Sequence, residues 1–446
     1  MDPSKTLDDV PDNLSAKYKD SFAYLTVRDR MPVILTKVVD TVYRMKNKMR
    51  DECGEDTSDE LKDITGRLSK LRFQIQTDKP VEHLEDSRTD TQFWNQHHQD
   101  LLKLNNGKPI KWFSAAWLYL ECYMYRRIQE SVELTNKLKG LDVFEEQKRE
   151  AYHTSEGAVT TLLTYLLEVV GQCQGYSSEE KADKLKQFLE VALWGNKCDL
   201  SISAGFSNSQ TTCILEQLNL LNPNILADDS QHVIQTLQQK RQTRGQAGRV
   251  DIVLDNAGFE LVTDLCLAEF LMSADLASSI HFHGKAIPWF VSDVTRNDLE
   301  WMLQIMMGTN NLAISTFGAK WQERLKLGSW VFHDSDFWTS PFDFSLMKKR
   351  ANDLYSDLGE ADLVFFKGDL NYRKLVGDKR WDPTDSFSRS LRGFEPAPLC
   401  SLRALKSDVV VGLKPGLAEK TEHHDKDWMI NGKWAVISFH QLSGHS

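Results

Sequence analysis

The sequence predicts an α/β protein, in which an N-terminal helical region packs on a Rossmann-like α/β domain with a mostly parallel sheet. Up to about residue 200, apolar residues recur at helical spacing and strand-like runs are absent. After residue 210, short apolar runs alternate with helix-like segments, which is the pattern of βαβ units. A chain of 446 residues is too long for one simple core. We therefore predict a helical region over residues 1–210 and a Rossmann-like catalytic domain over residues 211–446.

The helical region contains segments with the apolar period of a packed helix. These predicted helices span residues 29–49, 59–76, 115–138 and 177–196. The first carries Pro32 in its opening turn, where the missing N–H is tolerated. The third is apolar nearly all round at its start, which is typical of a buried helix. The fourth begins with Ser177 or Ser178 as a cap and ends at a Gly-Asn pair.

The second half alternates between predicted strands and predicted helices. The strands span residues 249–255, 279–284, 330–334, 362–368, 399–405 and 408–413, and residues 433–440 add a last strand at an edge. The helices between them span residues 258–275, 295–308, 317–327 and 346–359. The basic, glycine-containing run over residues 238–249 is predicted to be a solvated loop before the first strand. Phosphate binding is the less favoured interpretation of that run.

Composition and charge exclude several classes of protein. With 41% hydrophobic and 26% charged residues, the chain has the composition of a soluble globular protein. The net charge of −10 argues against a general nucleic-acid-binding protein, which would carry a basic excess. No apolar stretch is long enough to span a membrane, and the N-terminus lacks the apolar core of a signal peptide. Seven scattered cysteines without a Cys-x-x-Cys pair fit free thiols, so we expect a cytoplasmic protein, with the nucleus as the alternative compartment.

Acidic and amide side chains follow three of the predicted strands. Asp255 and Asn256 end the first strand, Asp293 follows the second, and Asp369 follows the strand over residues 362–368. In open parallel sheets, ligands bind beyond the carboxyl ends of the strands, so we expect these side chains to converge. Carboxylate and amide oxygens are the hard ligands that Mg²⁺ or Mn²⁺ prefers. The alternative for Asp255 and Asp293 is structural, because Asp after a strand is a common helix N-cap.

Cationic side chains lie at the same predicted edge. They are Lys367, Arg373, Lys374, Arg403 and Lys406. Arg can bind a phosphate through two parallel hydrogen bonds, and Lys offers a single positive charge. The acids and cations together therefore predict a site for a metal ion and an anion at this edge of the sheet.

Other catalytic motifs have no support in the sequence. No P-loop, dinucleotide-binding glycine fingerprint or Gly-x-Ser-x-Gly elbow is present. His281 and His283, two apart on one strand, are interpreted as packed or surface histidines rather than as ligands.

Five segments resemble the damage-control phosphatase family. They are "LWGNKCDLSISAG" (193–205), "VLDNAGFELVTDL" (253–265), "PWFVSD" (288–293), "FFKGDLNYRKLVGD" (365–378) and "PLCSLRALKSD" (398–408). The resemblance is to the eukaryotic subgroup named for acidic residue methyltransferase 1. It extends to "AYLTVRDRMP" and "LSKLRFQIQTDKP" and covers most of the chain in the expected order. It implies a helical region packed on a Rossmann-like domain.

The resemblance also implies an activity and its residues. The family hydrolyses small phosphate esters, of the fructose 1-phosphate and fructose 6-phosphate type in this subgroup, with Mn, Ni, Co or Mg. By motif position, Asp255, Asn256 and Asp293 would be the metal ligands and catalytic residues. Substrate would contact Asp255 and Asn256 together with Asp369, Leu370, Asn371, Tyr372, Arg373 and Lys406. The subgroup's Arg-Thr-x-Lys signature is here Arg403-Ala404-Leu405-Lys406, so a hydroxyl is lost and both cations remain.

The subgroup's name implies a second candidate activity, the methylation of protein glutamate or aspartate carboxylates by S-adenosylmethionine. Arg72, Glu260 and Asp293 would then surround that cofactor, and a protein would be the substrate in place of a small phosphorylated metabolite. The sequence favours the phosphatase, because "DNAGFE" offers only one glycine and cations lie nearby. A non-catalytic scaffold is the third alternative, and the intact ligand residues argue against it.

Overall fold

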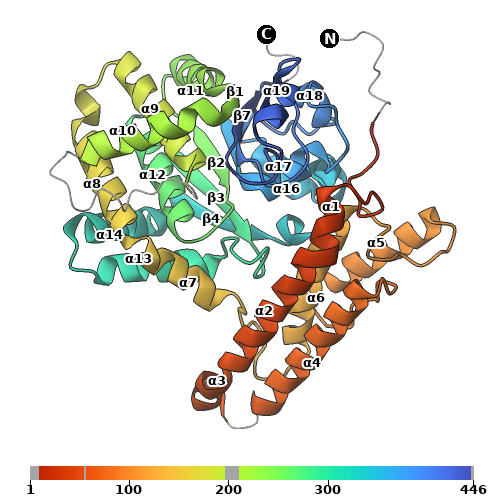
Figure 1. The fold of residues 1–446 in the computed structure, drawn as a ribbon. Helices are drawn as coiled ribbons and strands as arrows, with labels where there is room; N and C mark the ends of the chain where they lie inside the picture. Colours follow the sequence, from red (N-terminus) through yellow and green to blue (C-terminus); the bar gives the residue numbers. More distant parts are fainter. Residues whose placement is uncertain (1–9, 55–56, 196–209, 443–446) are drawn as a thin grey trace.

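A seven-stranded sheet forms the centre of the computed structural model, which describes residues 10–54, 57–195 and 210–442 (Figure 1). The strand order is β1-β7-β6-β5-β2-β3-β4. The strands are β1 Ile225–Asp228, β2 Arg249–Val253, β3 Ser279–Lys285, β4 Trp330–Ser335, β5 Leu363–Lys367, β6 Leu399–Ala404 and β7 Ala435–His440. All neighbours pair in parallel except β6 and β7. The predicted α/β class with a mostly parallel sheet is confirmed.

The connections diverge on the two sides of β2 and β5. From β2 the chain passes to β3 and then β4 on one side, whereas β5 leads to β6 on the other. The two central strands are buried because helices cover both faces of a parallel sheet. A crevice at the carboxyl ends of such diverging strands is the usual ligand site of doubly wound sheets.

Alternate residues of each strand enter different apolar cores. Phe365 packs into one cluster, whereas Val364 and Phe366 pack into the other. The first cluster contains helices from both halves of the chain. They include α8 Glu156–Gln172, α9 Ser178–Leu193, α12 Phe259–Ser273, α13 Arg296–Gly308 and α14 Leu312–Lys326. Helices α8 and α9 pack directly on α12, so the N-terminal half supplies part of this layer (Figure 1).

The second cluster joins the opposite face of the sheet to a helical arm, which we define as residues 22–133. The arm contains α1 Phe22–Leu25, the π-helix Thr26–Arg30, α2 Met31–Arg44, α3 Lys46–Cys53, α4 Thr57–Gln76, α5 Thr91–Leu104 and α6 Trp117–Glu133. In Figure 1 the arm, coloured red to orange, projects away from the sheet, and α7 Glu145–Thr154 leads back to it. The division at residue 210 stays a prediction. None of the helices in the described residues is long and apolar enough to cross a membrane.

The remaining helices lie in the second half of the chain, before and between the strands of the sheet. They are α10 Gln210–Leu221, α11 Ser230–Arg244, α15 Met347–Arg350, α16 Asn352–Leu358, α17 Gly368–Val376, α18 Phe387–Ser390 and α19 Leu417–His424. Most predicted helices are confirmed in type, with shifted ends. The helix predicted over 29–49 is divided into a π-turn, α2 and α3, and the one over 346–359 into α15 and α16. The segment 193–205 lies mostly outside the described residues.

Two sequence predictions in the second half are wrong. The run 238–249 is not a loop throughout, because α11 continues to Arg244 and ends at Gly245 with a φ of 73°. Residues 408–413 form no strand, since the N–H of Val411 donates to the Tyr372 hydroxyl at 3.0 Å instead of to a neighbouring strand. The short strand β1 was not predicted.

Candidate active site

The loops after β2 and β3 pair with each other at the point where the sheet connections diverge. Asn256 and Asp293 form an isolated antiparallel bridge. Two backbone hydrogen bonds flank it, from Val294 N to the Asp255 carbonyl at 2.9 Å and from Ala257 N to the Ser292 carbonyl at 2.7 Å. The structure thus brings together Asp255, Asn256 and Asp293, as the strand-end argument predicts.

The Asn256 side chain lies between two carboxylates. Its Nδ2 donates to Asp255 Oδ2 at 2.8 Å and to Glu260 Oε2 at 2.9 Å. Its Oδ1 accepts from the Ser292 hydroxyl at 2.5 Å. Glu260 occupies the first turn of α12, so this helix contributes a third acid to the site. The hydroxyl and the two carboxylates fix which side of the amide carries the nitrogen.

The acids of this cluster are buried. Asp255, Glu260 and Asp293 expose only 7%, 5% and 2% of their surface. Burial, together with the charges of Glu260 and Asp293, raises the pKa of Asp255 well above its ordinary value. Burial raises the pKa of Asp293 to about 6 against the opposing charge of Lys285. Such a concentration of buried negative charge costs free energy that a bound cation would relieve.

Lys285 is the counter-ion of Asp293. Its Nζ lies 3.2 Å from Asp293 Oδ2 and donates to the Leu254 carbonyl at 2.9 Å. Asp293 Oδ2 has no hydrogen-bond donor among the described residues, so this contact is an ion pair and leaves a lone pair on the oxygen. Lys285 is not among the residues predicted from the sequence, although it ends β3 and therefore lies at a strand end like the predicted acids.

The backbone has unusual conformations next to Asp255 and just before Asp293. Gly368 begins α17 with a φ of 82°, and a Cβ there would lie 1.9 Å from Asp255 Oδ2. Only glycine therefore allows the start of α17 to approach this carboxylate. On the other side, Phe290 and Val291 have φ of 43° and 72° just before Asp293. A β-branched residue in that region is strained, and such strain is concentrated at functional sites.

Asp369 connects α17 to the loop after β6. Its Oδ1 accepts from Arg403 Nε at 2.8 Å, from the backbone N–H of Lys406 at 3.1 Å and from the Ser407 hydroxyl at 3.1 Å. The Lys406 side chain is exposed, and its positive charge favours ionisation of Asp255 against the larger effect of burial. Lys406 is thus the predicted substrate-binding cation that is both close to the acids and accessible.

Arg373 pairs with carboxylates outside the cluster of Asp255, Glu260 and Asp293. Its Nε donates to Asp378 Oδ1 at 2.7 Å and its Nη1 to Glu121 Oε2 at 2.6 Å, while the guanidinium lies 3.7 Å over the Trp117 ring. This buried network joins α17 to α6 of the arm. The contact of Arg373 with substrate stays a prediction. Within the protein, Arg373 contacts Asp378, Glu121 and Trp117.

The other predicted cations and α17 residues also have structural partners. Lys367 donates to the Ala192 carbonyl at 2.6 Å and pairs with Asp264 at 2.6 Å. Lys374 donates to the Trp338 and Ser340 carbonyls, and Asn371 Nδ2 donates to the Leu254 and Lys367 carbonyls. Leu370 is buried, and the Tyr372 hydroxyl accepts from Val411. These residues hold the loops around the site.

Arg72 lies on α4 of the arm. Its Nη1 donates to the Thr36 hydroxyl at 3.0 Å, a contact that joins α4 to α2. The structure brings Glu260 and Asp293 together at the strand ends, and the role of Arg72 at a cofactor stays a prediction.

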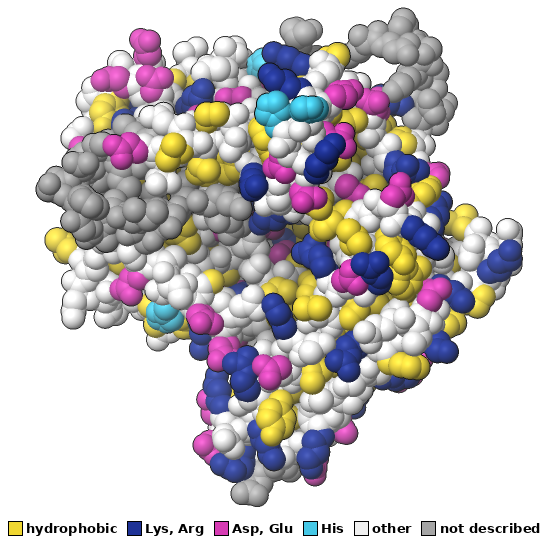
Figure 2. All heavy atoms as spheres, in the orientation of Figure 1, with side chains coloured by type: hydrophobic (Ala, Val, Ile, Leu, Met, Phe, Trp, Pro, Cys, Tyr) yellow, Lys and Arg dark blue, Asp and Glu magenta, His cyan; other side chains and the backbone are white. Residues whose placement is uncertain are grey.

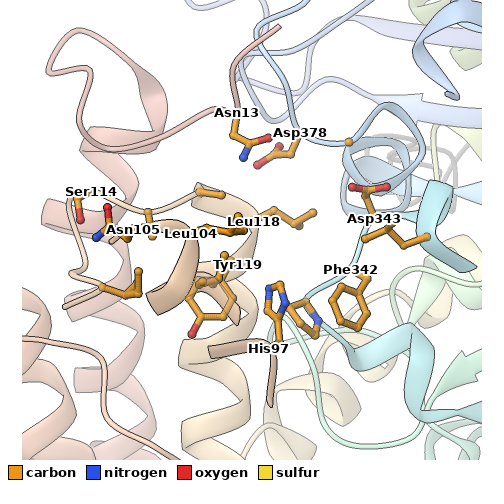
Figure 3. A pocket seen from close by; sticks show the side chains of 17 residues that line it. Asn13, His97, Leu104, Asn105, Ser114, Leu118, Tyr119, Phe342, Asp343 and Asp378 are labelled. Atoms are coloured by element: carbon orange, nitrogen blue, oxygen red, sulfur yellow. The ribbon is translucent and has the colours of Figure 1, made fainter. Parts of the chain in front are cut away.

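Figure 2 shows Lys and Arg side chains around the hollow between the arm and the α/β layers. A separate pocket of about 410 Å³ lies between the arm and the loops near α17 (Figure 3). His97, Leu118 and Phe342 project into it from different elements, and Asn13 and Asp378 close one side. It is lined by none of the predicted site residues, so the buried acids and not this pocket define the candidate active site.

Comparison with known proteins shows the family of this chain. A family model described as "Damage-control phosphatase ARMT1-like domain" matches residues 26–421. The chain belongs to the ARMT1-like damage-control phosphatase family. The curated "Damage-control phosphatase ARMT1" of Danio rerio is 50% identical over 435 residues, which cover 96% of this chain and 97% of the relative. The human protein of that name is 44% identical over 96% of this chain and 98% of its own.

A solved structure of a DUF89 family protein from Pyrococcus horikoshii also overlaps with this ARMT1-like chain. The TM-score is 0.40 at 15% identity, and the overlap covers 84% of this chain and 97% of that one.

Proposed function

We propose that this ARMT1-like chain is a metal-dependent phosphatase that hydrolyses small sugar phosphates of the fructose 1-phosphate and fructose 6-phosphate type. The observation that carries the proposal is the buried cluster of Asp255, Asn256 and Asp293 at the point where the sheet connections diverge. Family membership supports phosphate ester hydrolysis as the reaction. The substrate class follows from the resemblance of the strand-end motifs, and the exposed Lys406 supports an anionic substrate.

The residues present fit a divalent cation. Two carboxylates and an amide oxygen form a hard donor set, and Asp293 Oδ2 keeps a free lone pair. Gly368 lets the start of α17 pack against the Asp255 carboxylate, which any side chain at this position would displace. Asp255, Asn256 and Asp293 would therefore hold Mn²⁺, Co²⁺, Ni²⁺ or Mg²⁺. When bound, the ion would polarise a phosphoryl oxygen and lower the barrier to attack at phosphorus.

The surrounding residues orient this donor set. Lys285 holds the Asp293 carboxylate, and Ser292 donates to the Asn256 oxygen, which fixes the amide plane. Asp369 holds the backbone of Lys406, so the ammonium of Lys406 is available to neutralise the substrate phosphate. Binding of the phosphate between the acids and Lys406 would place the ester at the edge of the sheet, where the backbone of α17 begins.

A phosphate-release assay tests the proposal. Purified protein would be assayed on fructose 1-phosphate and fructose 6-phosphate with each metal ion and with a chelator. We expect activity that requires metal, and we expect Asp255→Asn or Asp293→Asn to lower kcat by at least roughly 100-fold, because each removes a charged group at the reacting centre.

Asp334→Asn is the matched control, since Asp334 also lies near the carboxyl end of a strand but forms an exposed pair with Arg296. Equal activity in chelator, or full activity in Asp255→Asn, would contradict the proposal. Calorimetry with S-adenosylmethionine examines the methyltransferase alternative, which requires binding of that cofactor at the same acids.

A further inference from the structure

A second cluster of metal-ligating side chains lies on the arm-facing side of the sheet, away from the strand ends. It contains His281 and His283 of β3, His333 of β4, Asp251 of β2 and Asp357 of α16. The imidazoles form a stack, with centroids 5.0 Å apart from His281 to His333 and 5.0 Å apart from His333 to His283. Strand alternation brings them to one face, because His281 is paired with Asp251 and His283 with His333.

The geometry of two ring nitrogens suits a metal ion. His333 Nε2 and His281 Nδ1 face each other at 3.0 Å, and a ligand oxygen of Asp357 lies within 4.8 Å of both. Two nitrogens that bind one tetrahedral ion at about 2.0–2.1 Å are about 3.3 Å apart, so a shift of a few tenths of an ångström is enough. Binding of a metal ion to both nitrogens need not release a proton from the cluster. The hydrogen that one nitrogen donates to the other can move to the second nitrogen of the same imidazole ring.

The charges of the cluster are compatible with a bound cation. Burial, and to a smaller extent the positive charge of Arg249, lowers the pKa of His281 to about 4. This imidazole is therefore neutral at pH 7. Burial likewise lowers the pKa of His333. Arg249 donates to Asp251 and to Asp357, which orients both carboxylates and leaves one net negative charge. Because Arg249 repels a cation, we expect a reversible site rather than a permanently filled one.

The cluster is accessible and separate from the acids at the strand ends. His281 and His333 are half-buried, and the Asp357 side chain is 40% exposed, so an ion can enter from solvent. Asp251 precedes Asp255 by four residues, which corresponds to roughly 13 Å along an extended strand. The two donor sets also differ in kind, because imidazole favours borderline transition metals whereas carboxylate and amide oxygens favour harder ions.

We propose that His281, His333 and Asp357 form a second metal site, specific for a borderline divalent transition metal such as Zn²⁺, which joins strand β3 and the edge strand β4 to α16. A fourth position would be left to water, as in zinc sites with three protein ligands. Asp251 and Arg249 would act as outer partners that hold the carboxylate and the imidazole stack. The site is independent of the phosphatase proposal and does not require it.

Zinc titration of the full chain tests this site. The starting protein is the double variant Asp255→Asn with Asp293→Asn, which removes the acids at the strand ends, and Zn²⁺ binding is measured by calorimetry. We expect one zinc ion per chain. Adding His281→Asn and His333→Gln should weaken binding by at least roughly 100-fold, because both imidazole ligands are lost. Asn and Gln place a polar atom near the former Nδ1 and Nε2, so the contact between the strands is preserved.

His232→Gln is the matched control, since this histidine is exposed and outside the cluster, and it should leave zinc binding unchanged. Asp357→Asn provides a second variant at an exposed position and should weaken binding by at least about 10-fold. X-ray absorption at the zinc edge should show two imidazole nitrogens at about 2.0–2.1 Å. Absence of zinc binding in the starting protein, or equal affinity after the histidine substitutions, would overturn the proposal.

Discussion

At the scale of single residues, the candidate site depends on how closely the backbone approaches one carboxylate. Gly368 lies against Asp255 with a φ that L side chains rarely adopt, and Asn256 is held by hydrogen bonds to Asp255, Glu260 and Ser292. Neither contact adds apolar burial. Both restrict the positions of oxygen atoms, which is what a metal site or a transition state requires.

Gly368→Ala should therefore inactivate the protein. The added Cβ would lie 1.9 Å from Asp255 Oδ2, so the carboxylate must move. We expect phosphate release to fall by at least roughly 100-fold and the protein to be destabilised by about 1–3 kcal/mol through backbone strain. Steady-state kinetics and thermal unfolding would measure both effects.

Gly393→Ala separates the two causes. Gly393 has the same φ of 82°, but a Cβ there meets nothing within 4 Å. This variant should share the loss of stability and keep its activity. If both variants lost activity equally, backbone strain and not the contact with Asp255 would be responsible.

The sequence could predict which acids lie at the candidate site, but not which partners the predicted cations contact. Asp255, Asn256 and Asp293 follow parallel strands, and the carboxyl ends of such strands meet at one edge whatever the loops do. The partner of Arg373 is Glu121, which precedes it by 252 positions, and Lys367 pairs with Asp264. The residue types at one edge of the sheet do not show which cation forms an ion pair with an acid from a distant part of the chain.

At the scale of elements, α17 connects the site to the arm. Its first residue, Gly368, contacts Asp255, and the next, Asp369, accepts from the Lys406 N–H in the loop after β6. Its last turn carries Arg373, which reaches α6. A displacement of α17 would therefore move the Asp255 carboxylate, the Lys406 loop and the contact with the arm together.

The Arg373–Glu121 pair should contribute mainly to stability. Arg373→Ala leaves the buried Glu121 and Asp378 without their cation, and we expect a loss of about 3–5 kcal/mol. Glu121→Gln should be milder, and the double variant should lose less than the sum of the single losses. Denaturant unfolding would give these values, and Lys62→Ala, in an exposed pair with Asp59, is the control. A large increase in KM with unchanged stability in Arg373→Ala would instead assign Arg373 to the substrate.

Elements with a strong apolar period were predictable, and those defined by distant partners were not. Helix α12 and strands β2 and β5 follow their sequence pattern closely. Strand β1 has four residues and exists because β7, more than 200 positions later, pairs with it. Residues 408–413 are apolar like a strand, yet their burial comes from packing near α17, where Tyr372 accepts the Val411 N–H.

At the scale of the whole molecule, the arm and the sheet share one apolar core. Buried side chains of α2, α4 and α6 belong to the same cluster as Val364 and Phe366 of the sheet. The arm is thus held by apolar burial as well as by the Arg373 network, and a change of charge inside the arm is expected to affect the stability of the chain. His98 of α5 is such a group, since it is 3% exposed and its Nδ1 lies 3.0 Å from the Tyr119 hydroxyl of α6.

The contribution of His98 to the stability of the protein should therefore decrease below neutral pH. Burial, with a smaller effect of His83, lowers the pKa of His98 to about 4, below the ordinary value of 6.5. As the pH falls, the unfolded chain binds a proton before the folded chain does, so the stabilisation is complete above about pH 6.5 and is lost toward pH 4. At pH 5 this corresponds to a loss of up to about 2 kcal/mol from His98.

His98→Asn tests this origin, because an amide near the former Nδ1 can still contact Tyr119 but does not titrate. The variant should be less stable than the parent at pH 7, and its melting temperature should fall less between pH 7 and pH 5. His232→Asn, at an exposed histidine, controls for the loss of one imidazole. An unchanged slope of melting temperature against pH in His98→Asn would show that protonation at the α5–α6 contact does not limit the stability of the molecule in acid.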